Sequence, residues 1–425
     1  MVKYILGFFV LSPLAGLIMM ENGAFGVSVA QFGYENGASA AYLAYAAAFL
    51  AVFALATRSS RTRPPQIQRS AAFQADFRTA AVLVLALNMA FLLTIMWGFG
   101  GYQVLTAAVG KGEFRATLGA GGALAYLVTK FFAPALLAYL TVLYVREGRS
   151  GRHRALLLLN YVIGFALGLG WGFKTTAIWI VLPSLIILYW RLPVRRAAGF
   201  SLGVPALLVG MFMLFDRDGE ALLDVLEQLW IRATVIQGDV SWLVWDMQRN
   251  GEPFPNYWIT LLPAIGDRLL TALTAVSKEN YVEWIAYHYD LLLTQLVGYP
   301  VEGIEGGHTV TGTPFSEGLI AFGSPGFLLA GVVAGLVVAW NYRLMRASLE
   351  RGRAIICAMA TTYFAFATLP WLNGGGIIQL FHLSVWVALF VTWLLLAGIA
   401  GVRRPRILRR RAAPRAASGA APGTA

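Results

Sequence analysis

Two basic residues of this chain stand where their charge could bind phosphate. Lys174 follows Gly172 and Phe173 in a short turn between two apolar segments, with no acid near it in sequence, and Arg232 borders the apolar stripe of an expected helix. Lysine offers a compact charge and arginine a bidentate fork, and both suit phosphate oxygens. The alternative for such a cation is a carboxylate partner or a position at the headgroup level of a membrane. We predict that Lys174 and Arg232 bind phosphate.

His308 is the next candidate, because histidine near neutral pH can accept a proton from a hydroxyl group. It lies in the glycine-rich segment 306–312, directly before an apolar segment. The alternative is a solvated loop histidine. Its position alone favours the solvated loop histidine, so His308 stays a candidate general base at this point.

Other polar and aromatic residues of the same region are candidate substrate contacts. Asp239, Trp242, Asp246 and Arg249 would share one helical face, with Asp239 as a possible N-cap. The full predicted substrate-binding set is Arg249, Arg268, Lys278, Asp239, Asp246, Trp242, Trp245, His288 and Glu317.

The sequence predicts no metal site and no cofactor. It contains no phosphate-binding glycine loop with lysine, no His-Glu-x-x-His and no cysteine pair. Asp216-Arg217-Asp218 has the Asp-x-Asp spacing that some sugar transferases use for a metal-bound nucleotide. It also fits a solvated helix exit beside Gly219, and this is the interpretation we adopt.

These residues need a scaffold, and the composition predicts a membrane-embedded one. The 425 residues are 58% apolar and 13% charged, with a mean hydropathy of +0.66. Apolar runs of about 20 residues, enough to cross a bilayer core, recur along the chain. We predict an all-α polytopic membrane protein with about ten transmembrane helices. Their expected ranges are 3–20, 40–57, 79–97, 118–145, 155–172, 175–190, 197–215, 318–340, 354–372 and 377–399.

The basic residues fall on alternate turns between these segments. Lys3 and five clusters hold 24 of the 33 basic residues. Because Lys and Arg are retained on the cytoplasmic side during insertion, these turns and both termini are expected to be cytoplasmic. Topology therefore explains the net charge of +12, and nucleic acid is not an expected partner. The clusters are 58–78, 146–154, 191–196, 343–353 and 403–415.

This topology predicts four parts of the chain. Residues 1–215 form a bundle of seven spans, 216–317 a large periplasmic loop, 318–402 a bundle of three spans, and 403–425 a disordered basic cytoplasmic tail. The loop carries fifteen acids and five basic residues.

Inside the loop, apolar residues at helical spacing over 220–236 and 282–296 predict amphipathic helices. Thr313-Pro314 is expected to start another helix, as N-cap and first residue. The single cysteine, Cys357, can make no intramolecular disulfide, and a large outer loop without cysteines fits a bacterial periplasm at least as well as a eukaryotic lumen.

Three segments resemble the Wzy-type O-antigen polymerases, a family of oligosaccharide repeat-unit polymerases. Gly172-Phe173-Lys174-Thr175-Thr176 resembles the family's Gly/Ser-x-Lys/Arg turn, and Arg232 with Gly238 resembles the Arg-led helix of its large loop. Residues 307–318 with Phe322-Gly323-x-x-Gly326 resemble the segment where that loop re-enters the membrane. The likeness covers about 155–340. The Arg-x(10)-Gly signature of some members is absent, because Leu243 stands at the glycine position.

The resemblance implies transfer of a growing glycan from undecaprenyl pyrophosphate to a new lipid-linked repeat unit, on the outer face of a bacterial inner membrane. Lys174 and Arg232 would stabilise the departing pyrophosphate, and His308 would take the acceptor's proton. The bilayer and a chain-length regulator would be partners. The alternatives are an O-antigen ligase, a GT-C type glycosyltransferase that uses lipid-linked sugars, and a transporter or flippase of lipid-linked glycans.

Overall fold

The computed structural model is helical throughout the part of the chain that it describes. That part is residues 2–23, 32–58, 77–105, 114, 122, 127–147, 150–170, 174–190, 192–193, 195–196, 199, 203, 223, 226–227, 230–231, 235–277, 279–305 and 309–401. No strand occurs among these residues. The prediction of an all-α chain is confirmed for them.

Eight helical segments within the described ranges are long and apolar enough to cross a bilayer, which confirms a polytopic membrane protein. A shorter apolar helix, α9 (Lys174–Leu188), lies at the expected span 175–190. Most of the expected span 197–215 and the whole tail 403–425 fall outside the described residues, so a count of ten stays a prediction. The eight segments are α1 (Val2–Glu21), α2 (Ala38–Thr57), α3 with η2 (Phe77–Gly98), η3 with α7 (Val128–Glu147), α8 (Gly151–Gly170), α18 (Gly326–Glu350), α19 with η5 and α20 (Ala354–Gly374), and α21 with α22 (Ile378–Gly401).

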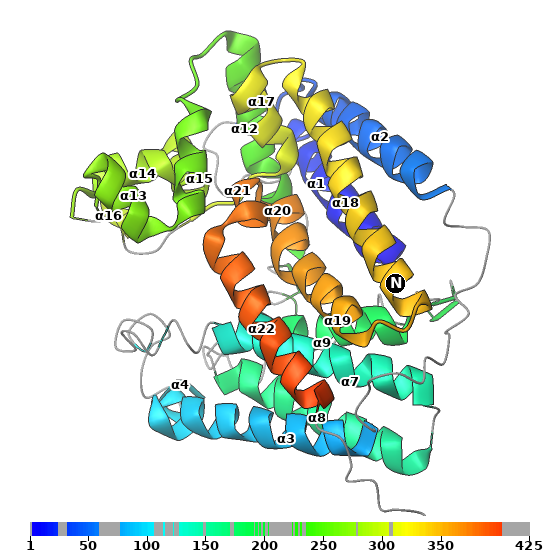
Figure 1. The fold of residues 1–425 in the computed structure, drawn as a ribbon. Helices are drawn as coiled ribbons and strands as arrows, with labels where there is room; N and C mark the ends of the chain where they lie inside the picture. Colours follow the sequence, from blue (N-terminus) through cyan, green and yellow to red (C-terminus); the bar gives the residue numbers. More distant parts are fainter. Residues whose placement is uncertain are drawn as a thin grey trace, which may run out of the picture.

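The spans form two groups that run crosswise to one another (Figure 1). In the first group α1, α2 and α18 lie side by side, and in the second α3, α7, α8 and α9 form a layer beneath them. Helix α19 joins the groups, because it packs against α18 as well as α7 and α9. The short helix α4 (Gly101–Leu105) follows α3 at one end of the second layer.

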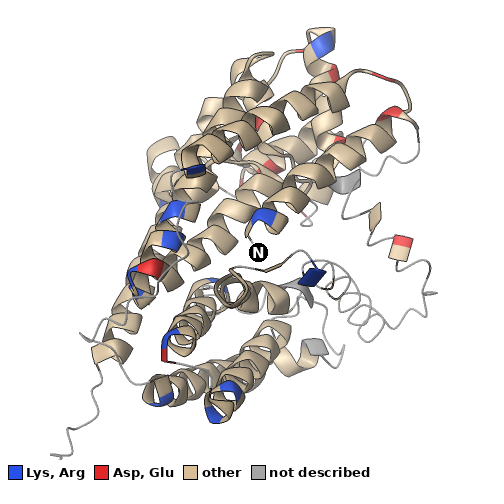
Figure 2. Ribbon diagram, turned by 90° about the vertical axis from the view of Figure 1, so that its right-hand side faces the viewer, with Lys and Arg blue, Asp and Glu red and all other residues tan. Residues whose placement is uncertain are grey.

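Three of the basic turns that are expected to share one membrane face are connected by hydrogen bonds among the described residues. The backbone N–H of Phe77, at the start of α3, donates to both carboxylate oxygens of Glu147 at 3.0 and 3.1 Å. Arg146 donates to the carbonyl oxygen of Gly352, in the turn between α18 and α19, at 3.0 Å. In Figure 2 acidic residues gather in the upper part of the molecule and most basic residues lie below them. This arrangement agrees with the alternation of the charge pattern.

The expected loop is a folded set of short helices where the structure describes it. Helix α12 (Val235–Asn250) packs against α1, α2 and α17. Four helices beyond it enclose a small separate core that includes Leu270, Trp284, Ile285 and Ile304. Most of the expected helix 220–236 lies outside the described residues. The four helices are α13 (Asp267–Thr274), α14 (Tyr281–Tyr287), α15 (Tyr289–Leu296) and α16 (Val301–Glu305).

A 3-10 helix, η4 (Tyr257–Ile265), connects α12 to α13 and includes Pro263. It ends at Gly266, which has a φ of +96°. That backbone conformation favours glycine, and it turns the chain sharply into α13.

Helix α17 (Pro314–Phe322) crosses the expected border between loop and membrane span at residue 317. Thr313 is its N-cap and Pro314 its first residue, as predicted, and the Thr313 N–H donates to Ser316 Oγ at 3.0 Å. The chain then bends at Gly323, whose φ is +70°, before α18 begins at Gly326. The span therefore starts eight residues later than the sequence predicted, because a separately capped helix precedes it.

Candidate functional site

Glu317 is a buried carboxylate at the junction of the loop and the membrane spans. Its side chain accepts hydrogen bonds from the Tyr257 hydroxyl of η4, from Trp371 Nε1 of α20 (Leu369–Gly374) at 2.9 Å and from the Ile377 backbone N–H at 2.6 Å. The backbone N–H of Gly376 donates as well. Only 6% of the residue is exposed. Glu317 thus ties three segments that are distant in sequence to α17.

The two backbone donors come from a glycine turn between α20 and α21 (Ile378–Phe381). Gly375 and Gly376 have φ values of +68° and +71°, which favour glycine. A Cβ added to Gly375 would also lie 2.6 Å from a ring carbon of Tyr289. The glycines therefore allow the turn to lie against the loop and to direct its N–H groups at the carboxylate.

Burial governs the protonation of this cluster. It raises the pKa of Glu317 above the ordinary value of 4.5, although the hydrogen bonds from Tyr257, Ile377 and Trp371 act in the opposite direction. The pKa of the Tyr257 hydroxyl is raised by its own burial and by the nearby charge of Glu317. Tyr257 therefore stays protonated and acts as a donor.

An apolar pocket of about 390 Å³ begins at Glu317 and extends between η4, α17, α18 and α21. Trp258, Phe322 and Phe381 line it and are each at least half exposed, so its rim is aromatic. The remaining lining residues are Tyr257, Leu261, Ala264, Pro314, Gly318, Ala321, Leu329, Ala330, Val333, Trp371, Ile377 and Ile378. The pocket presents apolar walls and a single polar end.

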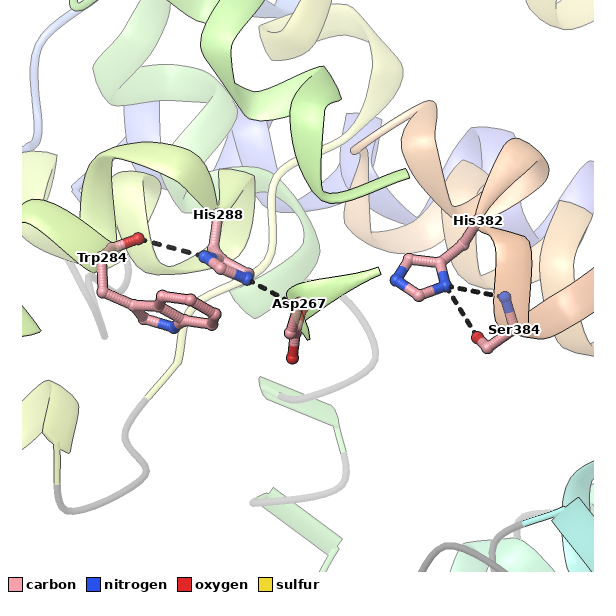
Figure 3. Close-up of polar contacts among 5 residues, drawn as sticks. All are labelled: Asp267, Trp284, His288, His382 and Ser384. Carbon is pink, nitrogen blue, oxygen red and sulfur yellow. Dashed lines mark hydrogen bonds and ion pairs between the residues drawn. The ribbon is translucent and has the colours of Figure 1, made fainter. Parts of the chain in front are cut away.

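A second polar cluster lies just beyond two of the pocket walls. Asp267 follows η4 by two residues, and His382 directly follows α21. Figure 3 shows Asp267 between the imidazole rings of His382 and His288. His288 Nε2 is 3.7 Å from Asp267 Oδ1, and its ring stacks on Trp284 with a centroid distance of 4.3 Å. This arrangement places one carboxylate beside two imidazole rings.

The predicted face of α12 packs against the N-terminal part of the chain. Asp239 is buried and its Oδ1 accepts from the Val240 N–H at 2.7 Å, while Trp242 is 1% exposed and contacts Tyr34 at a ring distance of 5.0 Å. Because α12 begins at Val235, the interpretation of Asp239 as an N-cap is wrong. Contact of Asp239 and Trp242 with a sugar stays a prediction.

The exposed end of the same face is tied to the segment before α2. Asp246 accepts from the Tyr34 hydroxyl at 2.7 Å and from Asn36 Nδ2 at 3.1 Å. Arg249 and Trp245 Nε1 both donate to the Asn36 carbonyl oxygen, at 2.5 and 2.9 Å. These three predicted substrate-binding residues therefore fix the loop to the spans in the structure.

The residues predicted to act on phosphate or as a base are placed only in part. Lys174 is the first residue of α9, in the layer of α7 and α8, and its side chain lies outside the described part. Arg268 is exposed on α13. Arg232, Lys278 and His308 lie outside the described residues, so their roles stay predictions.

Sequence reasoning selected Glu317 and His288 but none of the residues that surround them. Tyr257, Trp371, Asp267 and His382 come from four separate segments, and no spacing connects them. One sequence feature did indicate the glycine turn: the run Asn373 to Gly376 separates two apolar segments and contains three successive glycines. Such a run indicates a turn that needs unusual backbone angles.

Within the described residues, no group of three or more His, Cys, Asp or Glu is placed to hold a metal ion. No family model, no curated protein and no solved structure matches the chain. The assignment of a function therefore depends on the residues and their geometry.

Proposed function

We propose that this chain is a glycosyltransferase that polymerises undecaprenyl-pyrophosphate-linked oligosaccharide repeat units into a surface polysaccharide, an O-antigen or an exopolysaccharide. It would act on the periplasmic face of a bacterial inner membrane, with ten spans and both termini in the cytoplasm. The observation that carries the proposal is the apolar pocket between span α18 and loop element η4, which has polar groups at its inner end and beside its walls.

An isoprenoid-linked substrate fits the shape and chemistry of this pocket. Trp258, Phe322 and Leu329 on the rim are exposed apolar side chains, and Leu329 belongs to a membrane-spanning helix. Such walls are as apolar as the lipid tails of a bilayer, so a hydrocarbon chain can lie against them without contact with water. A lipid whose chain enters here would hold its polar head at the level of the loop helices.

The reaction needs groups that act on the leaving pyrophosphate. An acceptor hydroxyl oxygen attacks the anomeric carbon, the bond from that carbon to the phosphate oxygen breaks, and the pyrophosphate leaves with the electron pair. Fixed cations stabilise the charge that develops on it. Lys174 and Arg232 are the proposed cations, with Arg249, Arg268 and Lys278 as further contacts. The resemblance implies His308 as the base.

Polymerisation is tested by complementing a strain that lacks this gene and separating its surface glycans by size. Wild-type protein is expected to restore long chains, whereas Lys174→Ala and Arg232→Ala leave single repeat units on the surface. His308→Ala tests the base that the resemblance implies, and it should also leave single repeat units if His308 takes the proton. Arg152→Ala, in a turn with the opposite predicted orientation, is the matched control and should restore the full ladder.

The other functions predict different patterns in the same experiment. Loss of every repeat unit from the surface would indicate export by a transporter. Full-length polymer that stays on its lipid carrier would indicate a ligase. An unchanged ladder in all three variants would contradict the proposed roles of the three residues.

A further inference from the structure

Asp267, His288 and His382 come from three separate segments and lie near one another at helix ends, with an ion-pair contact between Asp267 and His288. Asp267 is the first residue of α13, His288 separates α14 from α15, and His382 separates α21 from α22 (Leu383–Gly401). Residues 267 and 382 are 115 positions apart, so only the tertiary fold brings these side chains together (Figure 3).

The contact of His288 with the Trp284 carbonyl oxygen determines which ring nitrogen carries the proton and which one can act as a base. Nδ1 is 3.0 Å from the Trp284 carbonyl oxygen, and a carbonyl can only accept. Nδ1 therefore carries the proton in the neutral ring. Nε2, which lies 3.7 Å from Asp267 Oδ1, is then the nitrogen that can receive a second proton. The stacking on Trp284 fixes the plane of the ring.

His382 has the opposite tautomer. Its Nδ1 accepts from the Ser384 backbone N–H at 3.2 Å and lies 2.7 Å from Ser384 Oγ. Because a backbone N–H can only donate, Nδ1 is unprotonated, and the proton of the neutral ring is on Nε2. Figure 3 shows this Nε2 turned toward Asp267. Asp267 therefore faces an acceptor nitrogen on one side and a donor nitrogen on the other.

Asp267 is the member of the cluster that a substrate can reach. Its side chain is 53% exposed, whereas that of His288 is 19% exposed. Ala264 and Phe381, which precede Asp267 and His382 by three residues and one residue, both line the apolar pocket. A lipid chain in that pocket would bring its polar head to the same side of η4 and α21.

We propose that Asp267 is the base that takes the proton from the attacking hydroxyl, and that His288 and His382 are positioning residues. This inference rests on the proposed glycosyl transfer and replaces His308 by Asp267 in the proton-transfer step. As the hydroxyl oxygen bonds to the anomeric carbon, its proton passes to Asp267 Oδ and the pyrophosphate leaves with its electron pair. Afterwards Asp267 releases the proton to water or to His288 Nε2.

The test uses the full chain in proteoliposomes, with the purified lipid-linked repeat unit as donor and acceptor. The initial rate of formation of the two-unit product is followed from pH 5 to pH 9. Asp267→Asn is expected to lower kcat by at least about 100-fold, the usual contribution of a general base, with little change in KM. Asp267→Glu should recover part of that rate, because it retains the carboxylate.

The histidine variants separate positioning from a purely structural role. His288→Gln and His382→Gln should lower the rate less and move the acidic limb of the pH profile, since both rings face Asp267 and Arg268 is its neighbour in α13. Asp290→Asn, an exposed carboxylate of α15, is the matched control and should behave as wild type. The monodisperse yield of each detergent-solubilised variant shows that it folds.

Two outcomes would overturn the inference, and they are distinguishable. Wild-type protein that elongates while Asp267→Asn stays within about threefold of its kcat removes Asp267 as the base and leaves polymerisation in place. Wild-type protein that does not elongate the purified repeat unit overturns the proposed function and this inference with it.

Discussion

At the scale of single residues, the carboxylate of Glu317 is stabilised by hydrogen bonds from uncharged donors. The Tyr257 hydroxyl, the Trp371 indole and the N–H groups of Gly376 and Ile377 are all uncharged donors. A buried carboxylate without hydrogen bonds would be strongly destabilising, and these donors offset much of that cost. Since the same contacts join η4, α17 and the glycine turn, the protonation of Glu317 is coupled to how firmly the loop is attached.

The raised pKa of Glu317 predicts a specific dependence of stability on pH. Because the folded state binds this proton more tightly than the unfolded state, the stabilisation is fully present below about pH 4.5 and is lost as the pH rises through the raised pKa. Wild type should therefore lose thermal stability relative to Glu317→Gln over this range. Unfolding in detergent, followed by tryptophan fluorescence at several pH values, measures the difference.

The control for this measurement is Glu302→Gln, a substitution of an exposed carboxylate in α16. Its unfolding temperature should follow that of wild type at every pH. A constant difference between Glu317→Gln and wild type across the whole range would contradict a raised pKa in the folded protein.

At the scale of helices, close packing between spans depends on small residues. Helices α2 and α18 run parallel, and Gly331 and Gly335 of α18 lie against the carbonyl oxygens of Tyr45 and Phe49. Without a hydrophobic driving force between helices in lipid, such close approach provides the packing energy. This pair of helices in turn places α17 and the pocket, because α17 packs against α18 and its Phe315 contacts Tyr45 at a ring distance of 6.0 Å.

Gly331→Ala should therefore destabilise the protein even though alanine favours helix. A Cβ at this position would lie 2.7 Å from the Tyr45 carbonyl oxygen, so the two backbones must separate. Overpacking of this kind costs about 1–3 kcal/mol. The unfolding temperature in detergent should fall for Gly331→Ala and not for Gly398→Ala, where a Cβ would meet no atom within 4 Å. Equal effects in the two variants would contradict the role of the close contact.

At the scale of the whole molecule, basic residues and acidic residues lie toward different ends of the helices. The start of α3, the end of α7 and the turn between α18 and α19 are connected through Glu147, Arg146 and Gly352. The short helix α4, which follows α3, lies against the end of α8. A Cβ added to Gly101 would lie 2.7 Å from the Gly170 carbonyl oxygen. Acidic residues gather in the upper part of the molecule (Figure 2), where Figure 1 places α12 and α17. We predict one orientation of the chain, in which the basic turns face the cytoplasm.

Cysteine labelling tests that orientation. In a Cys357→Ala background, Glu279→Cys in the loop and Arg152→Cys in a basic turn each introduce one exposed thiol. A membrane-impermeant maleimide applied to cells with a permeabilised outer membrane should label position 279. Position 152 should be labelled only after the inner membrane is broken. Labelling of both positions, or of position 152 alone, in intact inner membranes would contradict the proposed topology.

Some local features of the site could be predicted from the sequence. Thr313-Pro314 starts a helix because an N-cap and a first-turn proline satisfy or remove backbone donors locally. The apolar periodicity of 282–296 predicted one helix, whereas the chain forms α14 and α15 with a break at His288. Tertiary packing around Trp284 and Tyr289 outweighs the helical preference at that point.

The sequence by itself determined that the described chain is helical and membrane-embedded, since apolar length is a local property that a bilayer selects directly. It also predicted which turns share one face of the membrane, because each basic cluster orients the spans on either side of it. Only the tertiary structure placed Glu317 among donors from η4, α20 and the glycine turn, and Asp267 between His288 and His382. Those contacts join residues tens to more than a hundred positions apart, and no periodicity or spacing records which distant segments will pack together.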